Sequence, residues 1–158
     1  MKKVILPGSY DPITLGHLEV VKRAAREYGE VYVVAFINPD KKYLFSVEER
    51  VKMLSLATEG LDNVKVDFYG GYVVDYMKER GIDLIVKGYR NETDYEYELR
   101  QAEYNKAHGG YDTVLWLCED EFKGISSTKA REIITAGENM SEILPQKVIS
   151  FINSLNSH

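Results

Sequence analysis

A histidine near the amino-terminus has the neighbours expected of a phosphate-binding group. His17 lies in a segment with Gly8, Ser9 and Gly16, which follows a short apolar run and precedes an amphipathic stretch. This pattern predicts a strand, a glycine-containing turn and a helix. The first turn of a helix offers free backbone N–H groups to an anion, and an imidazole there adds a side-chain donor. The segment therefore predicts phosphate chemistry, although His17 could also serve only to cap the helix or to pack.

The residues between Gly8 and His17 indicate how the histidine is positioned. Gly8 would let the backbone turn tightly after the strand, and Pro12 keeps Asp11 extended and so delays the helix. Thr14 is a suitable N-cap, which places His17 at the third helical position. The helix N-terminus disfavours an imidazolium ion, whereas a bound polyphosphate favours it. Either form can donate a hydrogen bond to a phosphoryl oxygen.

A lysine pair follows the second predicted strand. A lysine pair in a turn is often only solvated. Lys41 and Lys42, however, lie in the loop after a central strand, at the same edge of the sheet as the histidine segment. A lysine there can reach a phosphate as a flexible point charge.

Two more cations lie where the fourth predicted strand ends. Lys87 and Arg90 flank Gly88, which allows close backbone approach, and Arg90 offers a planar fork of donors. This pattern favours a phosphate site. The alternative is a surface ion pair between Arg90 and Glu92 or Asp94.

Consecutive hydroxyl residues precede the fifth predicted helix. Residues 124–129 read Gly-Ile-Ser-Ser-Thr-Lys. The hydroxyl groups can cap the helix, or they can leave its N–H groups free for a triphosphate with help from Lys129 and Arg131. The sequence leaves both interpretations open.

Alternating strand and helix patterns predict an α/β fold in which one doubly wound sheet of five parallel strands has helices on both faces. The expected strands are residues 3–6, 30–37, 63–68, 83–86 and 113–118, and the expected helices are residues 15–28, 46–58, 73–80, 93–108, 128–136 and 145–155. Capping boxes are expected at residues 46–49 and 93–96. Ligands of such sheets bind beyond the carboxyl ends of the strands. Residues 8–17, 38–45, 88–92 and 119–128 should therefore line one rim.

Length and composition restrict the possible functions. The chain has 158 residues, which suggests one domain over residues 1–158, and a net charge of −5 argues against a nucleic-acid partner. Its one cysteine, Cys118, lies in an apolar run and is expected to be a buried structural thiol. No cluster has zinc-ligand spacing, so no protein metal site is expected. No leader or membrane span is recognisable, which predicts a cytoplasmic protein without a membrane partner.

These motifs resemble the bacterial phosphopantetheine adenylyltransferases, which belong to the nucleotidyltransferases with a His/Thr-x-Gly-His signature. The resemblance covers almost the whole chain and rests on an ordered set of motifs. These are residues 7–14, the signature Thr14-Leu15-Gly16-His17, Lys41-Lys42, residues 45–50, residues 94–98 and residues 125–128. It implies a Rossmann-like fold, a homohexamer and a single nucleotidyltransferase domain. It also implies adenylyl transfer from ATP to 4′-phosphopantetheine with Mg²⁺, giving dephospho-coenzyme A and pyrophosphate, and possible feedback by coenzyme A.

The resemblance also implies roles for individual residues. The catalytic residues would be His17, Lys41 and Arg90. The acceptor would be held by Ser9, Lys41, Val73 and Lys87. The nucleotide would be held by Ser9, Tyr10, His17, Gly88, Tyr89, Arg90, Glu98, Phe122, Lys123, Gly124, Ile125, Ser126, Ser127 and Thr128.

The chain departs from the family pattern mainly on the acceptor side. Family members usually carry arginine at position 87, two leucines at Tyr72-Val73 and serine at position 128, and Tyr89 and Asn91 also differ. Lys87 keeps the charge but lacks the bidentate fork. The alternatives are therefore a related transferase that acts on nicotinate mononucleotide or glycerol 3-phosphate, or a non-catalytic nucleotide-binding module. A flavodoxin-like electron carrier would not need His17 or the lysines.

Overall fold

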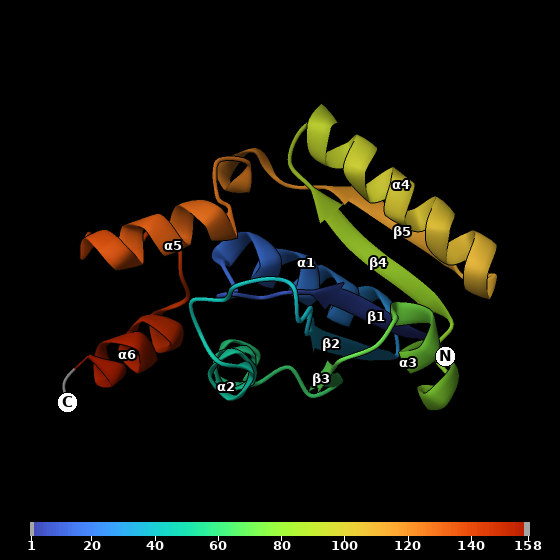
Figure 1. Ribbon diagram of the computed structural model, residues 1–158, viewed down its shortest axis with the longest axis horizontal. Coiled ribbons are helices and arrows are strands. Elements are labelled where there is room, and N and C mark those ends of the chain that lie inside the picture. The colour runs from blue at the N-terminus through green and yellow to red at the C-terminus, as the bar shows by residue number, and fades with distance from the viewer. Residues whose placement is uncertain (1, 157–158) are drawn as a thin grey trace.

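A parallel five-stranded sheet forms the centre of the protein (Figure 1), seen in a computed structural model that describes residues 2–156. The strands are β1 (Lys3–Gly8), β2 (Glu30–Phe36), β3 (Val64–Tyr69), β4 (Leu84–Tyr89) and β5 (Asp112–Leu117). Their order in the sheet is β3-β2-β1-β4-β5, and every pair is parallel. The chain thus winds outward from β1 in both directions, which confirms the predicted doubly wound α/β fold.

Helices contribute to apolar clusters on both faces of this sheet. One cluster includes side chains from α1 (Leu15–Glu27), α2 (Val47–Ala57), α5 (Ser127–Ala136) and α6 (Gln146–Leu155). The other face carries α3 (Val73–Arg80) and α4 (Glu92–Gly109), and α4 also packs on β4 and β5. Figure 1 shows α5 and α6 projecting to one side of the sheet. A short 3₁₀ helix, η1 (Asp120–Phe122), precedes α5 and was not predicted.

The continuous apolar run in β2 follows from its position between β1 and β3. Val31, Val33 and Ala35 enter one apolar cluster, whereas Tyr32 and Val34 enter the other. All five are buried, so neither face of β2 requires polar side chains.

Two predicted strands extend further than their apolar runs. β1 continues to Gly8, which pairs with Ala35, and β4 continues to Tyr89, which pairs with Leu117. Parallel pairing thus extends past the last apolar residue, so Gly8 and residues 87–89 are strand residues. The bend after β1 falls at Tyr10, which has a positive φ of 49°, and not at Gly8 as predicted.

The helix starts were predicted less well than the helices themselves. The capping boxes at Ser46–Glu49 and at Thr14–His17 are present, and Thr14 caps α1 as predicted. The capping box expected at residues 93–96 is wrong, because Asn91 caps α4 and its side chain accepts from the backbone N–H of Asp94. Likewise Ser126 caps α5, which begins at Ser127 and not at residue 128. No helix within residues 2–156 has the length and apolar character needed to span a membrane.

A buried carboxylate joins the loop after β1 to the loop after β2. Asp11 is 2% exposed, and its two carboxylate oxygens accept hydrogen bonds from the backbone N–H groups of Leu44 (2.8 Å) and Phe45 (2.9 Å). The loop that contains Lys41 is thereby anchored at its end to the loop that leads into α1.

We expect Asp11→Ala to lower the free energy of unfolding by about 2–4 kcal/mol, because two backbone N–H groups lose their acceptors inside the fold. Asp11→Asn keeps one oxygen acceptor and should fall between the alanine variant and the wild type. Asp40→Ala, which removes an exposed carboxylate from the tip of the same loop, should change stability by less than about 0.5 kcal/mol. Urea denaturation of the three variants measures this order, and equal effects of Asp11→Ala and Asp40→Ala would contradict it.

Candidate active site

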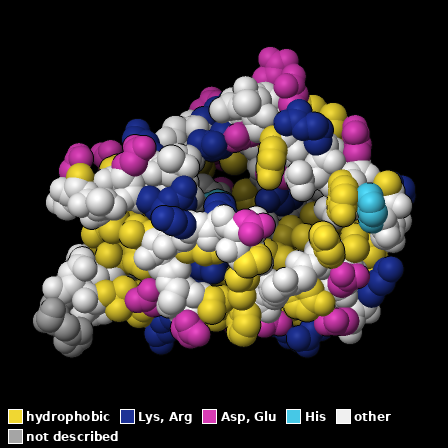
Figure 2. All heavy atoms as spheres, in the orientation of Figure 1, with side chains coloured by type: hydrophobic (Ala, Val, Ile, Leu, Met, Phe, Trp, Pro, Cys, Tyr) yellow, Lys and Arg dark blue, Asp and Glu magenta, His cyan; other side chains and the backbone are white. Residues whose placement is uncertain are grey.

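A cavity of about 390 Å³ lies at the carboxyl ends of β1 and β4, and all four predicted loops reach it. Ser9 lines it from the first loop, Lys41 from the second, Arg90 from the third, and residues 125–128 from the fourth. Figure 2 shows this hollow near the middle of the molecule, with Lys and Arg side chains beside it. Segments distant in the sequence thus converge on one opening, as the topology of the sheet predicted.

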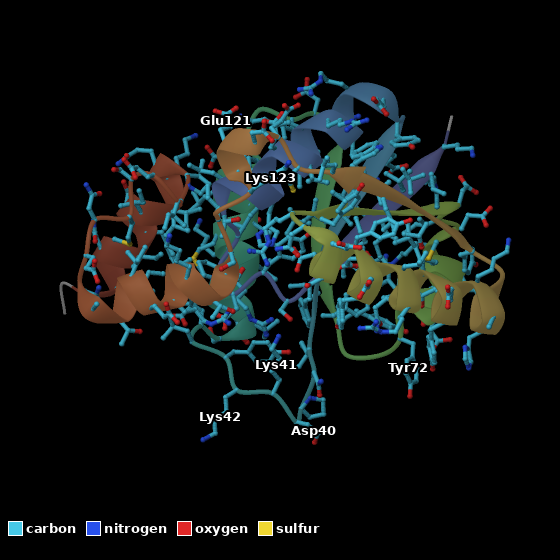
Figure 3. The ribbon with its side chains drawn as sticks, turned by 90° about the horizontal axis from the view of Figure 1, so that it is seen from above. Asp40, Lys41, Lys42, Tyr72, Glu121 and Lys123 are labelled. Atoms are coloured by element: carbon cyan, nitrogen blue, oxygen red, sulfur yellow. The ribbon has the colours of Figure 1, made fainter. Side chains whose placement is uncertain are left out.

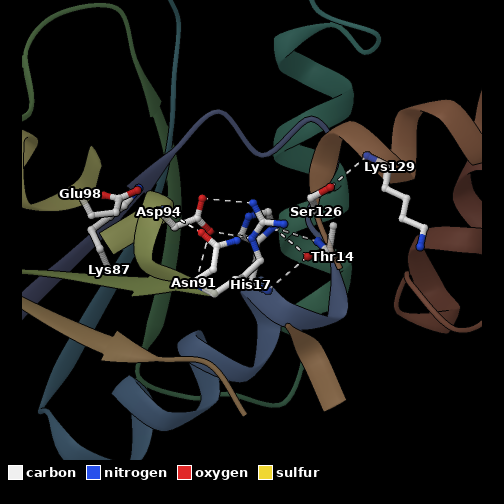
Figure 4. Close-up of polar contacts among 9 residues, drawn as sticks. Thr14, His17, Lys87, Asn91, Asp94, Glu98, Ser126 and Lys129 are labelled. Carbon is white, nitrogen blue, oxygen red and sulfur yellow. Dashed lines mark hydrogen bonds and ion pairs between the residues drawn. The ribbon is translucent and has the colours of Figure 1, made fainter. Parts of the chain in front are cut away.

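His17 is held by the residue that caps its own helix. The backbone N–H of Thr14 donates to Nδ1 of His17 at 3.1 Å, and the backbone N–H of His17 approaches Thr14 Oγ1 at 3.3 Å (Figure 4). The Tyr10 and His17 rings pack in a T-shaped arrangement, with 5.2 Å between centroids. Since a backbone N–H cannot accept, Nδ1 must be the unprotonated nitrogen of the ring. The proton of the neutral imidazole therefore sits on Nε2.

The imidazole of His17 is neutral at physiological pH. Burial, and then the positive charges of Lys87 and Arg90, lower its pKa from 6.5 to about 4. The helix N-terminus acts in the same direction. At neutral pH His17 can therefore donate a hydrogen bond through Nε2–H but cannot transfer a proton as an acid.

Lys41 contacts Ser9 across the two anchored loops. Its Nζ donates to Ser9 Oγ at 3.1 Å. Figure 3 shows Lys41 turned toward the body of the molecule, whereas Asp40 and Lys42 extend from the tip of the loop. The local pattern did not distinguish the two lysines, but they differ in position, and of the two Lys41 lines the cavity.

Lys87 faces a carboxylate and a carbonyl group inside the cavity. Its Nζ donates to the carbonyl oxygen of Pro7 at 3.0 Å and lies 3.5 Å from a carboxylate oxygen of Glu98 (Figure 4). Burial raises the pKa of Glu98, and Lys87 partly opposes that shift. The pair fixes the ammonium group of Lys87 at the carboxyl end of β4.

Arg90 forms the ion pair with Asp94 that the sequence offered as its alternative role. Nε of Arg90 lies 2.8 Å from Asp94 Oδ2, and Nη2 lies 3.3 Å from Oδ1. Both residues line the cavity and each side chain is about one-third exposed. The ion pair therefore orients the guanidinium at the site and does not remove it, since an arginine has five donors.

The start of α5 combines the two roles that the sequence left open. The Ser126 side chain caps the helix, and Ser127 Oγ donates to the carbonyl oxygen of Pro12 at 3.1 Å. Arg131 donates to the carbonyl oxygen of Asp11 at 3.0 Å and to Thr128 Oγ1 at 3.1 Å. These hydroxyls are thus used within the fold, yet they and Arg131 also line the cavity.

Most of the predicted site residues line the cavity, but four do not. Those that do are Ser9, Tyr10, His17, Lys41, Lys87, Gly88, Arg90, Glu98, Phe122, Ile125, Ser126, Ser127 and Thr128. Tyr89 packs on Tyr95, Lys123 pairs with Asp120, Gly124 follows in the same turn, and Val73 begins α3. The Tyr10 hydroxyl donates to the carbonyl oxygen of Leu6 at 2.9 Å, so that hydroxyl serves the fold.

At Gly88 the close approach that the sequence predicted is made by side chains of the protein itself. A Cβ atom at Gly88 would lie 2.7 Å from Val20 Cγ2 on α1 and 3.5 Å from Cys118 Sγ. The missing side chain therefore lets β4 pack against α1 beneath the cavity. Cys118 is only partly buried and lines the cavity wall, which corrects the expectation of a fully buried thiol.

Asp94 was not among the predicted site residues, although it lines the cavity. The sequence did contain a signal, because Asp94 lies four residues after Arg90, the spacing of a helical ion pair. Arg131 was named only as an accessory to the hydroxyl run. Its spacing from Ser127 places both residues near one helix face, which is the pattern that could have identified it.

Comparisons with a protein family and with individual proteins agree with one another. Residues 5–133 match the cytidylyltransferase-like family. The phosphopantetheine adenylyltransferase of Clostridium novyi (strain NT) is 42% identical over 153 residues, which cover 96% of this chain and 95% of that protein. The phosphopantetheine adenylyltransferase of Corynebacterium diphtheriae is 42% identical over 96% of both chains, and that of Corynebacterium glutamicum (strain R) is 42% identical over 99% of this chain and 98% of its own.

We expect the His17 ring to titrate near pH 4 with the proton of its neutral form on Nε2. Because the folded-state pKa lies below 6.5, His17 contributes stability that is present above pH 6.5 and is lost as the pH falls toward 4. Long-range ¹H–¹⁵N NMR spectra of the histidine rings measure both the tautomer and the titration. His108 on α4 supplies an internal reference signal in the same spectra. A His17 ring that is protonated at pH 6, or that carries its proton on Nδ1, would overturn this assignment.

Proposed function

Since the chain belongs to the phosphopantetheine adenylyltransferase family, we propose that it transfers the adenylyl group of ATP to 4′-phosphopantetheine. The products are dephospho-coenzyme A and pyrophosphate. The observation that carries this proposal is the convergence of a neutral histidine donor with Lys41, Lys87 and Arg90 on one cavity. This combination suits a reaction between two phosphate groups.

The proposed reaction is a direct in-line attack. An oxygen of the acceptor phosphate forms a bond to the α-phosphorus of ATP, the bond from that phosphorus to the bridging oxygen breaks, and pyrophosphate leaves with the electron pair. The attacking oxygen is already anionic, so no general base is required. The protein positions the two phosphates and stabilises the charge that develops between them.

His17 is proposed to donate its Nε2–H to an oxygen of the α-phosphate. Its hydrogen bond with the Thr14 backbone N–H holds the ring in place before ATP binds. A donor that is already oriented costs no reorganisation in the transition state. Lys41 and Arg90 add positive charge near the same bond, and we propose these three as the catalytic residues.

The predicted binding residues divide between the two substrates. We propose that Ser9, Lys41 and Lys87 hold the phosphate of the acceptor, and that Ser9, Tyr10, His17, Gly88, Tyr89, Arg90, Glu98 and residues 122–128 hold the nucleotide. Val73 remains a proposed contact for the pantetheine arm, which would then extend beyond the cavity to the start of α3.

Mg²⁺ is proposed to arrive with ATP. The carboxylates that line the cavity are Asp94 and Glu98, and they face Arg90 and Lys87 respectively. Within residues 2–156 no cluster of three or more His, Cys, Asp or Glu side chains could hold a metal ion. The residues therefore do not fit a protein-held metal site, and we expect Mg²⁺ to bind phosphate oxygens and water.

We also propose that the chain forms one nucleotidyltransferase domain, lies in the cytoplasm, is inhibited by coenzyme A and assembles into a homohexamer. The hexamer is supported by α4, which has no fully buried residue and exposes the aromatic side chains Tyr95, Tyr97 and Tyr104. Exposed aromatic side chains are enriched where proteins contact one another.

The proposed function is tested by pyrophosphate release from ATP with 4′-phosphopantetheine, with and without Mg²⁺. We expect release that requires both the acceptor and the metal ion. Nicotinate mononucleotide and glycerol 3-phosphate serve as comparison acceptors, because Lys87 and Tyr72 depart from the family pattern on the acceptor side. Faster release with either of these acceptors would contradict the proposed substrate. ATP binding without release under any condition would indicate a non-catalytic nucleotide-binding module.

We expect His17→Ala to lower kcat by about 10²–10³-fold with little change in ATP affinity, because the lost hydrogen bond acts mainly on the transition state. Steady-state kinetics and calorimetric titration with ATP measure the two quantities. His108→Ala removes the histidine on the exposed face of α4 and should leave both unchanged. Near-normal turnover in His17→Ala would show that the role assigned to His17 is wrong.

A further inference from the structure

Arg50 is a buried cation that does not line the cavity. It closes the motif at residues 45–50, and it is 2% exposed. The motif explains its position, because Ser46 caps α2 and exchanges hydrogen bonds with Glu49. The next residue, Arg50, then turns into the protein beneath the first loop.

The guanidinium of Arg50 joins the ends of two neighbouring strands. Nη1 donates to the carbonyl oxygen of Ser9 at 2.8 Å and lies 3.5 Å from the carbonyl oxygen of Phe36. The group stacks on the ring of Tyr43 at 3.9 Å from its centroid. Tyr43 in turn accepts from the backbone N–H of Asn38 at 2.9 Å, so Arg50 is connected to the segments that follow both strands.

Arg50 has no ion-pair partner among residues 2–156. Between residues 2 and 156 no carboxylate lies within 4.0 Å of its guanidinium, and its buried Nε has no hydrogen-bond partner there. A buried charge without a counterion is costly. Ser9 is moreover contacted by two cations, with Arg50 at its carbonyl oxygen and Lys41 at its hydroxyl.

An anion on the cavity side of Ser9 would balance this arrangement. Ser9 lines the cavity, and a phosphate bound there would lie near both cations. We infer that Arg50 is a positioning residue for adenylyl transfer, which fixes the Ser9 peptide from behind and whose charge is balanced by the phosphate bound at Ser9 and Lys41. This inference rests on the proposed function, but it concerns a residue that touches neither substrate.

Binding of inorganic phosphate, as a probe of the site at Ser9 and Lys41, tests the inference without requiring turnover. In wild-type protein we expect inorganic phosphate to raise the melting temperature, since it binds the folded state. Arg50→Met removes the charge at similar length and should lose at least half of that rise, whatever its own melting temperature. Arg50→Lys keeps the charge and should keep the rise. Lys52→Met removes an exposed cation from the same helix and should behave as wild type.

Turnover supplies the second readout. We expect kcat to fall about tenfold or more in Arg50→Met and by less in Arg50→Lys, because lysine lacks the fork and the stacking face that hold Ser9. A merely structural role predicts a lower melting temperature with an unchanged phosphate-induced rise and unchanged kcat, and that result would overturn the inference. If Arg50→Met does not fold, wild-type kcat in Arg50→Lys overturns the positioning role, and a reduced kcat supports it. Absence of wild-type activity with every acceptor would refute the proposed function alone, because the melting comparison still decides the role of Arg50.

Discussion

The loop between β1 and α1 is held by side chains from other parts of the chain, and the rest of the site depends on this constraint. A phosphate-binding loop must leave its N–H groups available, so it cannot be fixed by regular backbone pairing. Its carbonyl oxygens would repel an anion, and here Arg50 from α2 bonds that of Ser9 while Arg131 from α5 bonds that of Asp11. The Asp11 carboxylate accepts from two backbone N–H groups of the loop after β2 and so fixes the loop that carries Lys41. The proposed phosphate site is thus a consequence of long-range polar contacts made inside the fold.

Two of the cations in the cavity are paired with carboxylates. In a chain with a net charge of −5, Lys87 lies opposite Glu98 and Arg90 lies opposite Asp94 at this one opening. The carboxylates hold the cations in place and reduce their mutual repulsion. The same cations, together with burial, keep His17 neutral. A neutral donor among oriented cations is suited to the stabilisation of phosphoryl charge and not to proton transfer.

The parts of the structure that could be predicted from sequence are those set by local or periodic patterns. The buried run of β2 and the Thr14–His17 spacing identify a central strand and a capped histidine without knowledge of any distant residue. The start of α4 could not be decided locally, because both Asn91 and Thr93 are suitable caps and the choice follows from where β4 ends. The bend at Tyr10 was also unpredictable, since a tyrosine with positive φ is rare and this one is buried in the apolar core.

The difference between local and long-range contacts separates the residues proposed for chemistry from those that position them. His17 lies three residues from the group that fixes its tautomer, so one short segment carries both the donor and its orientation. Arg50 lies 41 residues from Ser9, and only the neighbouring positions of β1 and β2 in the sheet bring the two together. A substitution in the first segment would be expected to disturb the reaction directly. One at Arg50 should act through the backbone of Ser9, so loss of phosphate-linked stability and loss of turnover should occur together.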